Sequence, residues 1–289
     1  MKQKEVDALI SLLDDPDSSV SGIVTDKLLK SGKEIIPQLE KAWEKTLDEV
    51  LQEKLEYLIQ NIQFISTQKS LQDWINKGAE YIFEGAVYLS QFQFPEVSFK
   101  QLDAEIDEIY REISPGFNNR LTALDKVKIM NHVIFEKYGY TRNSTNFYSP
   151  QNSYINQVIE SKRGNPISLS IIYMSVAYKL RLPVYGVNLP KNFILAFKNE
   201  YRQGEEEDGT DILFYINPYN KGTVLSRREI DYFIKQQNIK PDKTYYIPCS
   251  NIDIIIRLIN NLLLSYEKLG FNDKIEKLKE LLKIIVPAS

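Results

Sequence analysis

The chain has 289 residues, of which 43% are hydrophobic and 26% charged, and its formal net charge at pH 7 is −3. This composition is that of a folded globular protein, and the lack of a basic excess argues against a dedicated nucleic-acid-binding protein. The single cysteine, Cys249, excludes an internal disulfide, and the single histidine, His132, excludes a histidine-rich metal site.

Two further classes are disfavoured by the distribution of apolar residues. The first twenty residues become acidic after a few apolar positions, so they lack the apolar core of a signal peptide. No apolar stretch is long enough to span a membrane. We therefore expect a cytoplasmic protein that uses no cofactor and no metal and contacts neither membrane nor nucleic acid.

Residues 1–66 are predicted to form short helices joined by turns. Apolar side chains recur at helical spacing in four stretches, and the polar clusters Asp14–Ser19 and Ser31-Gly32 separate the first three. This pattern resembles HEAT-type repeats, although two helix pairs are too few for a solenoid. We favour a helical segment that packs on the main domain over an independent binding array.

Residues 67–240 are predicted to form the core domain around one buried helix. The stretch Ile167–Leu180 is apolar on nearly every side, so protein must cover it all round. Short strands are expected beside it at Val184–Asn188 and Phe193–Lys198. A further strand at Asp211–Asn217 is expected to pair with the second of these through an acidic turn at 203–209, which we interpret as a solvated hairpin tip because its spacing matches no calcium loop.

Residues 241–289 are predicted to form a C-terminal helical hairpin. The helices Asn251–Leu269 and Asn272–Ile285 flank Gly270, as in one tetratricopeptide-like pair. One pair makes no repeat surface, so we expect it to pack on the core. The fold class predicted for the whole chain is helix-rich α+β.

Four phrases in the middle of the chain occur in an order that resembles a known superfamily. They are Tyr148–Pro150 leading into Asn152–Tyr154, Arg163–Tyr173 (RGNPISLSIIY), Leu182–Val187 (LPVYGV) and Ile216–Asn220 (INPYN). Together they are similar to the transglutaminase-like superfamily, and most of all to its divergent SirB-type branch of bacterial proteins with helical or tetratricopeptide-like flanks. The resemblance covers roughly residues 71–225. It implies a papain-like core in which a buried central helix packs on a small antiparallel sheet.

Active members of that superfamily use a Cys-His-Asp triad. The resemblance implies that the three positions here are Pro166, Asn192 and Asn217. Proline has no side-chain nucleophile, and an asparagine amide takes up no proton near neutral pH. The triad is therefore predicted to be lost, including the histidine and the acid that most of the branch keeps.

A relocated nucleophile is the alternative interpretation. Cys249 precedes a predicted helix, and its only possible imidazole partner is His132, far earlier in the chain. Ser168 could be a nucleophile only with a lysine as base, and a hydrogen-bonding role at the helix start suits it better. We therefore favour structural roles for all three side chains over an amide or peptide hydrolase.

Polar residues at the former catalytic positions suggest binding instead of turnover. Amides and a lysine suit a peptide backbone or a carboxylate. The candidate cleft residues are Asn165, Ser168, Asn188, Lys191, Asn192, Asn217, Tyr219 and Asn220. A hydrogen bond between Asn192 and Asn217, which would fill the space of the lost His-Asp pair, is the slightly favoured alternative. The function predicted from the sequence is that of a catalytically inactive interaction or regulatory module with a protein or peptide partner.

Overall fold

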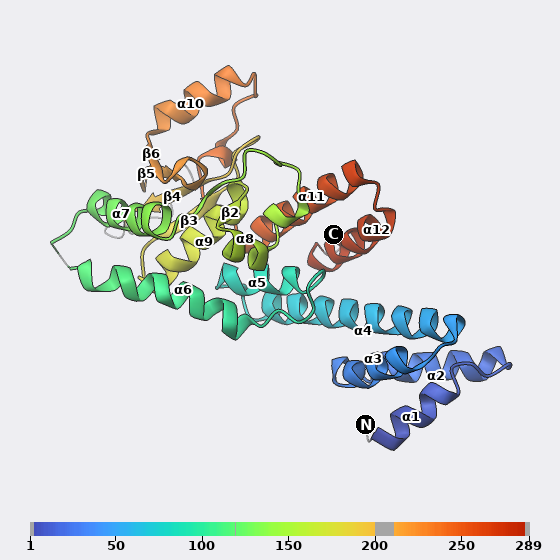
Figure 1. The fold of residues 1–289 in the computed structure, drawn as a ribbon. Coiled ribbons are helices and arrows are strands. Elements are labelled where there is room, and N and C mark those ends of the chain that lie inside the picture. Colours follow the sequence, from blue (N-terminus) through green and yellow to red (C-terminus); the bar gives the residue numbers. More distant parts are fainter. Residues whose placement is uncertain (1–2, 119, 200–210, 287–289) are drawn as a thin grey trace. The chain divides into compact units, whose positions relative to one another are not determined.

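The computed structural model describes residues 3–118, 120–199 and 211–286 (Figure 1). The chain divides into two compact units, one of residues 1–73 and 91–95 and the other of residues 74–90 and 96–289. The predicted acidic turn at 203–209 lies outside the described residues.

The first unit is helical, as its apolar spacing predicts. Its elements are α1 (Gln3–Ser11), α2 (Ser18–Lys30), a 3-10 turn at Lys33–Ile35, α3 (Ile36–Lys45) and most of α4 (Glu49–Asn76). Side chains from all of these helices form one apolar core, with Val6, Leu28, Leu39 and Leu55 fully buried. Pro37 sits in the first turn of α3, where its missing N–H leaves no helical hydrogen bond unmade.

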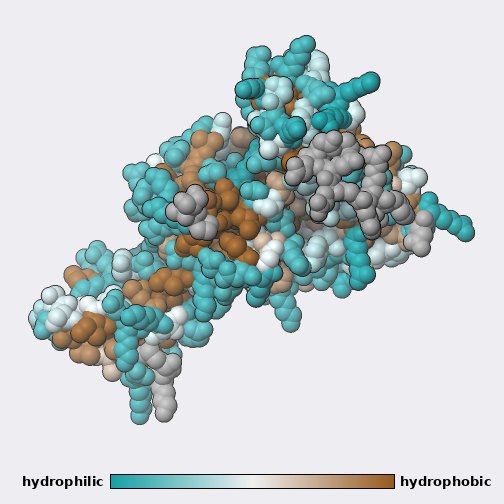
Figure 2. Space-filling view, turned by 180° about the vertical axis from the view of Figure 1, so that it is seen from behind, coloured by the Kyte–Doolittle hydropathy of each residue, from teal (hydrophilic) through white to brown (hydrophobic). Residues whose placement is uncertain are grey.

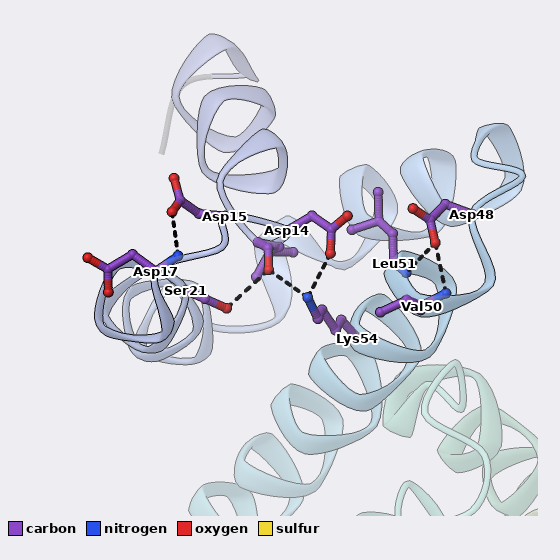
Figure 3. Close-up of polar contacts among 9 residues, drawn as sticks. Asp14, Asp15, Asp17, Ser21, Asp48, Val50, Leu51 and Lys54 are labelled. Atoms are coloured by element: carbon purple, nitrogen blue, oxygen red, sulfur yellow. Dashed lines mark hydrogen bonds and ion pairs between the residues drawn. The ribbon is translucent and has the colours of Figure 1, made fainter.

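Polar contacts fix the turn between α1 and α2 (Figure 3). The Leu13 carbonyl accepts hydrogen bonds from the Ser21 hydroxyl at 3.0 Å and from the Lys54 ammonium at 3.1 Å. Lys54 also lies 2.8 Å from the Asp14 carboxylate. A single lysine of α4 thus fixes the end of α1 relative to α4.

The first unit also has apolar residues at its surface (Figure 2, brown over the lower left). The large apolar and aromatic side chains exposed on this unit include Ile23, Trp43, Leu47, Val50 and Tyr57, of which Leu47 is 96% exposed. Helix α4 continues unbroken across the predicted domain boundary at residues 66–67. The stretch from Glu49 to Asn76 contains neither glycine nor proline, so nothing in it ends the helix.

Helix α9 (Pro166–Lys179) forms the centre of the second unit. Every residue from Ile167 to Ala177 is buried, which confirms the prediction of a helix covered on all sides. Helices α5 (Ile82–Ser90), α6 (Phe99–Ile113) and α8 (Ile155–Ser161) contact it, and so do strands β3 and β4. A helix in this position needs no polar face.

A small sheet packs beside α9. It has four antiparallel strands in the order β3-β4-β5-β6, at Val184–Val187, Ile194–Lys198, Ile212–Asn217 and Thr223–Leu225. A separate parallel pair joins β1 (Thr141–Arg142) to β2 (Arg163–Gly164), directly before α9. Helices around a small antiparallel sheet are the α+β arrangement that the sequence predicts.

Two further segments contain tighter or wider turns than an α-helix. Helix α7 (Ala123–Asn131) continues into a π-helical segment, His132–Lys137, whose turns are wider. A 3-10 turn, Lys243–Tyr245, follows Asp242, whose side chain accepts from the Thr244 N–H. Helix α10 (Arg227–Gln236) lies between β6 and this turn.

The two last helices, α11 (Asn251–Leu269) and α12 (Asn272–Ile285), pack on each other, and α11 also contacts α5 and α9. Gly270 ends α11 with φ +77°, a left-handed conformation that favours glycine. The Tyr154 and Tyr266 hydroxyls lie 2.9 Å apart and join the start of α8 to α11. None of the described helices is long and apolar enough to cross a membrane.

Candidate functional site

The start of α9 is built by a local network of hydrogen bonds. Asn165 caps the helix: its side-chain oxygen accepts from the Ile167 and Ser168 N–H groups, both at 2.9 Å. The Ser168 hydroxyl accepts in return from the Asn165 N–H at 3.0 Å. The Asn165 amide also donates to the Ser153 hydroxyl at 2.9 Å. This capping box satisfies N–H groups that a helix start otherwise leaves unpaired.

Gly164 is required where β2 meets α9. A Cβ atom at this position would lie 2.5 Å from the Ser168 hydroxyl oxygen and 3.2 Å from side-chain carbons of Leu169 and Val158. The phrase Gly-Asn-Pro-Ile-Ser is therefore explained by close packing, a cap and a proline at the first helical position. Ser168 is completely buried, and its hydroxyl makes the hydrogen bond at the helix start that the sequence suggests.

The second group of candidate residues lies at the end of β5. Asn217 ends this strand next to the start of β4, since Ile216 pairs with Leu195. Its side-chain oxygen is buried and has no hydrogen-bond partner among the described residues. The following 3-10 turn, Pro218–Asn220, contacts both β1 and α9. The region of Asn217 is thereby connected to the start of α9 through β1 and β2.

Tyr219 and Asn220 belong to this turn. Burial raises the pKa of the Tyr219 hydroxyl, and the nearby Arg142 guanidinium opposes that shift. Asn220 is exposed and donates to the Thr223 hydroxyl at 3.1 Å. The turn thus presents one half-buried phenol and one exposed amide.

The third group is the loop between β3 and β4, and Arg257 of α11 holds it. Its guanidinium donates to the Asn188 side-chain oxygen, to the Leu189 carbonyl at 2.9 Å and to the Asn192 carbonyl at 2.6 Å. It also lies over the Phe193 ring, 5.5 Å from the centroid. Burial lowers the pKa of this guanidinium, which nevertheless remains charged near neutral pH.

The predicted hydrogen bond between Asn192 and Asn217 is wrong. The Asn192 side-chain oxygen accepts from the Phe193 N–H at 2.9 Å, while that of Asn217 has no partner in the described part of the chain. Lys191 points elsewhere, with its ammonium 3.4 Å from the Gln237 side-chain oxygen. No hydrogen bond between described residues joins the 188–192 loop to Asn165, Ser168 or the 217–220 turn.

The structure does not bring Cys249 and His132 together, as a relocated nucleophile and its base would require. The Cys249 thiol donates to the Gly186 carbonyl at 3.4 Å, and burial, followed by the charge of Asp253, raises its pKa to about 12. A thiol with that pKa holds almost no thiolate near neutral pH. His132 is 68% exposed and its Nδ1 lies 2.7 Å from the Glu136 carboxylate. The imidazole contacts its own helix.

The role of Arg257 was not predicted, although the sequence contains a sign of it. Arg257 is the only basic residue in the apolar run IDIIIRLINNLLL of α11. A lone arginine at half-buried depth normally has several acceptors, because an unpaired buried charge is costly. The acceptors lie about 65 residues earlier in the chain, where no local pattern marks them. The described residues contain no cluster of three or more side chains suited to hold a metal ion.

Comparison with known proteins agrees with this geometry. Residues 100–260 match the family model described as Transglutaminase-like superfamily. The chain belongs to this superfamily. The match spans β1 to β6 and α9, so it covers the buried helix and the sheet beside it.

The relatives are of two kinds. F-box only protein 21 of Homo sapiens is 26% identical over 255 residues, which cover 80% of this chain and 39% of that protein. A UPF0162 protein of Xylella fastidiosa (strain 9a5c) is 29% identical over 168 residues, or 56% of each chain. The chain thus spans only about 40% of the length of the F-box only relatives. No solved structure matches.

Proposed function

We propose that this chain is a catalytically inactive member of the transglutaminase-like superfamily, of its SirB-type branch, and that it works as an interaction module for a protein or peptide partner. The observation that carries the proposal is the chemistry of Pro166, Asn192 and Asn217. None of these side chains supplies a nucleophile or moves a proton near neutral pH.

The surroundings of these positions support the same conclusion. The start of α9, where the superfamily resemblance puts the nucleophile, is a buried capping box instead of an open thiol site. The Asn192 side-chain oxygen accepts a hydrogen bond from the N–H of the next residue, Phe193. The buried, unpartnered oxygen of Asn217 is an acceptor that a donor from a bound peptide can satisfy.

The relatives also favour interaction over turnover. In the F-box only protein 21 relatives the matched region accounts for about 40% of the chain, so it occurs there beside other segments. A region of this kind suits recognition of a partner within a larger protein. The HEAT-like segment, with its exposed apolar residues, and the C-terminal helical pair are further surfaces that we assign to partner contact.

A peptide selection tests the proposal. A displayed peptide library is selected against the whole chain, and the affinities of the recovered peptides are measured for the Asn217→Ala, Tyr219→Ala and Lys191→Ala variants. We expect at least one of these changes to weaken binding about tenfold, the effect of one lost hydrogen bond to a buried or charged group. Asn260→Ala is the matched control, since Asn260 is an exposed amide on α11.

Two results would contradict the proposal. One is the failure of the selection to yield any peptide whose binding depends on these residues. The other is amide hydrolysis by the unaltered chain that disappears in Cys249→Ala or Ser168→Ala, which would establish a relocated nucleophile.

A further inference from the structure

A cavity lies between the 188–192 loop and the start of α11. Its volume is about 520 Å³, within the usual range of small-molecule sites. It is lined by Asn188, Pro190, Thr244, Tyr245, Ile247, Pro248, Cys249, Asp253 and Arg257. Only Asn188 among these belongs to the candidate cleft residues, so the cavity is distinct from the former triad positions.

Arg257 brings unused donors to this cavity. A guanidinium has five N–H groups, and three hydrogen bonds, to Asn188, Leu189 and Asn192, account for three of them. The other two, Nε–H and one Nη1–H, have no acceptor among the described residues and lie on different edges of the guanidinium. A carboxylate can therefore accept a single hydrogen bond from this guanidinium, which the three bonds hold in place and whose charge no described carboxylate neutralises.

Asp253 brings the opposite charge to the same cavity. It precedes Arg257 by four residues on α11, so the two side chains emerge from one face of the helix about 6 Å apart. One of its oxygens accepts from the Ser250 N–H at 3.0 Å and from the Ser250 hydroxyl at 2.6 Å. The other has no partner in the described chain. No ion pair joins Asp253 to Arg257 in this part of the structure, although this spacing normally permits one.

The remaining walls are largely apolar. Pro190, Ile247 and Pro248 line the cavity beside the half-buried Tyr245 ring. The Cys249 thiol adds a neutral surface, because its pKa is raised to about 12 mainly by burial. A ligand that fits this site has a carboxylate, a cationic group close to it, and an apolar substituent.

We propose that this cavity binds a free α-amino acid with an apolar side chain, its carboxylate on Arg257 and its ammonium group on Asp253. A terminal residue of a peptide has the same groups but keeps only one of the two charges next to its side chain. The paired, unbridged charges therefore favour the free zwitterion. This site shares Asn188 with the proposed peptide-binding cleft but contains none of Lys191, Asn217 and Tyr219, whose variants test that cleft, so its failure would leave that proposal untouched.

Ligand analogues test the two charged contacts on the unaltered chain. L-leucine, L-isoleucine and L-phenylalanine are titrated at millimolar concentrations and followed by backbone amide shifts in NMR spectra. We expect shifts in residues 244–249 and 253–257 with at least one of them. N-acetylation, amidation and extension to a dipeptide each remove or displace one charge, and each should weaken binding about tenfold, as expected for a hydrogen bond to a charged group.

A matched pair of variants locates the ammonium contact. Asp253→Asn should weaken the amino acid about tenfold and leave the N-acetyl derivative unchanged, because that derivative has no ammonium group to lose. Asp273→Asn removes the corresponding carboxylate from the first turn of α12, outside the cavity, and should change neither affinity.

Several outcomes would overturn the inference. They are the absence of cavity shifts with all three amino acids, equal affinities for an amino acid and both its N-acetyl and amide derivatives, and dipeptides that bind more tightly than free amino acids. The last outcome would assign the cavity to a peptide terminus. The analogue series keeps the inference open to refutation even where Asp253→Asn impairs folding.

Discussion

The starts of α9 and α11 have the same local design and opposite surroundings. Each begins with a polar cap that exchanges hydrogen bonds with the third helical residue, Asn165 with Ser168 and Ser250 with Asp253. The first is buried, and its hydrogen bonds stay within the protein. The second is exposed and borders a cavity with unpaired charges. Polar residues at a helix start therefore indicate a ligand site only where the surroundings leave donors and acceptors unused.

The largest expected effect concerns Cys249, just before α11. Because its pKa is about 12, against an ordinary value of about 9, the thiolate fraction near neutral pH should be lower by roughly a thousandfold. Alkylation by iodoacetamide should therefore be slow in the folded chain and fast in denaturant. The folded rate should still rise beyond pH 10, where an ordinary thiol has levelled off.

The same shift predicts a pH dependence of stability. The thiol of the unfolded chain loses its proton near pH 9, and that of the folded chain only near pH 12. This thiol's contribution to stability is therefore complete below pH 9 and declines as the pH rises toward 12.

The alkylation experiment can contradict the raised pKa of Cys249. A folded-state alkylation rate that levels off near pH 8 would show that the start of α11 does activate its cysteine.

Removal of the cap should destabilise the protein more at the start of α9 than at the start of α11. Asn165→Ala leaves buried N–H groups and the Ser153 hydroxyl without partners, and we expect a loss of about 3 kcal/mol in the free energy of unfolding. Ser250→Ala affects an exposed cap, and we expect about 1 kcal/mol. Urea denaturation of both variants measures the difference. Equal losses would mean that burial of the α9 start does not increase the contribution of its hydrogen bonds to stability.

Two buried tyrosine hydroxyls differ in whether they have a hydrogen-bond partner. The Tyr173 hydroxyl of α9 is buried without a partner among the described residues, whereas that of Tyr154 lies 2.9 Å from the Tyr266 hydroxyl of α11. Removal of an unsatisfied hydroxyl should stabilise, and removal of a paired one should destabilise. Tyr173→Phe should therefore gain about 1 kcal/mol and Tyr154→Phe lose about 1 kcal/mol. Thermal unfolding checks the sign, and a loss in both variants would contradict this account of Tyr173.

The sequence predicted the parts of this fold that depend on local pattern. The all-apolar helix at 167–180 and the strands beside it lie where apolar spacing and the superfamily phrases put them. The length of α4 was not predicted, since a change from aliphatic to aromatic side chains near residue 66 does not end a helix, whereas glycine or proline can.

The candidate site was less predictable because it depends on contacts between distant segments. Asn192 and Asn217 were expected to bond each other, yet the nearer Phe193 N–H takes the Asn192 oxygen. The role of Arg257 depends on three acceptors in the 188–192 loop, and the cavity depends on how that loop meets α11. Neither has a signature in the spacing of residues along the chain.

The smallest effect belongs to a third kind of helix junction, in the N-terminal unit. Lys54 joins the Leu13 carbonyl and the Asp14 carboxylate at the surface (Figure 3), with 38% of its side chain exposed. Water can replace its hydrogen bonds, so Lys54→Met should cost only about 0.5 kcal/mol, and less in high salt. Lys69→Met, on the same helix, is the control for loss of a lysine charge. A loss of stability as large as that of Asn165→Ala would contradict this expectation. It would show that exposure does not determine how much a helix junction contributes to the free energy of unfolding, and that the Lys54 contacts matter as much as the buried cap of α9.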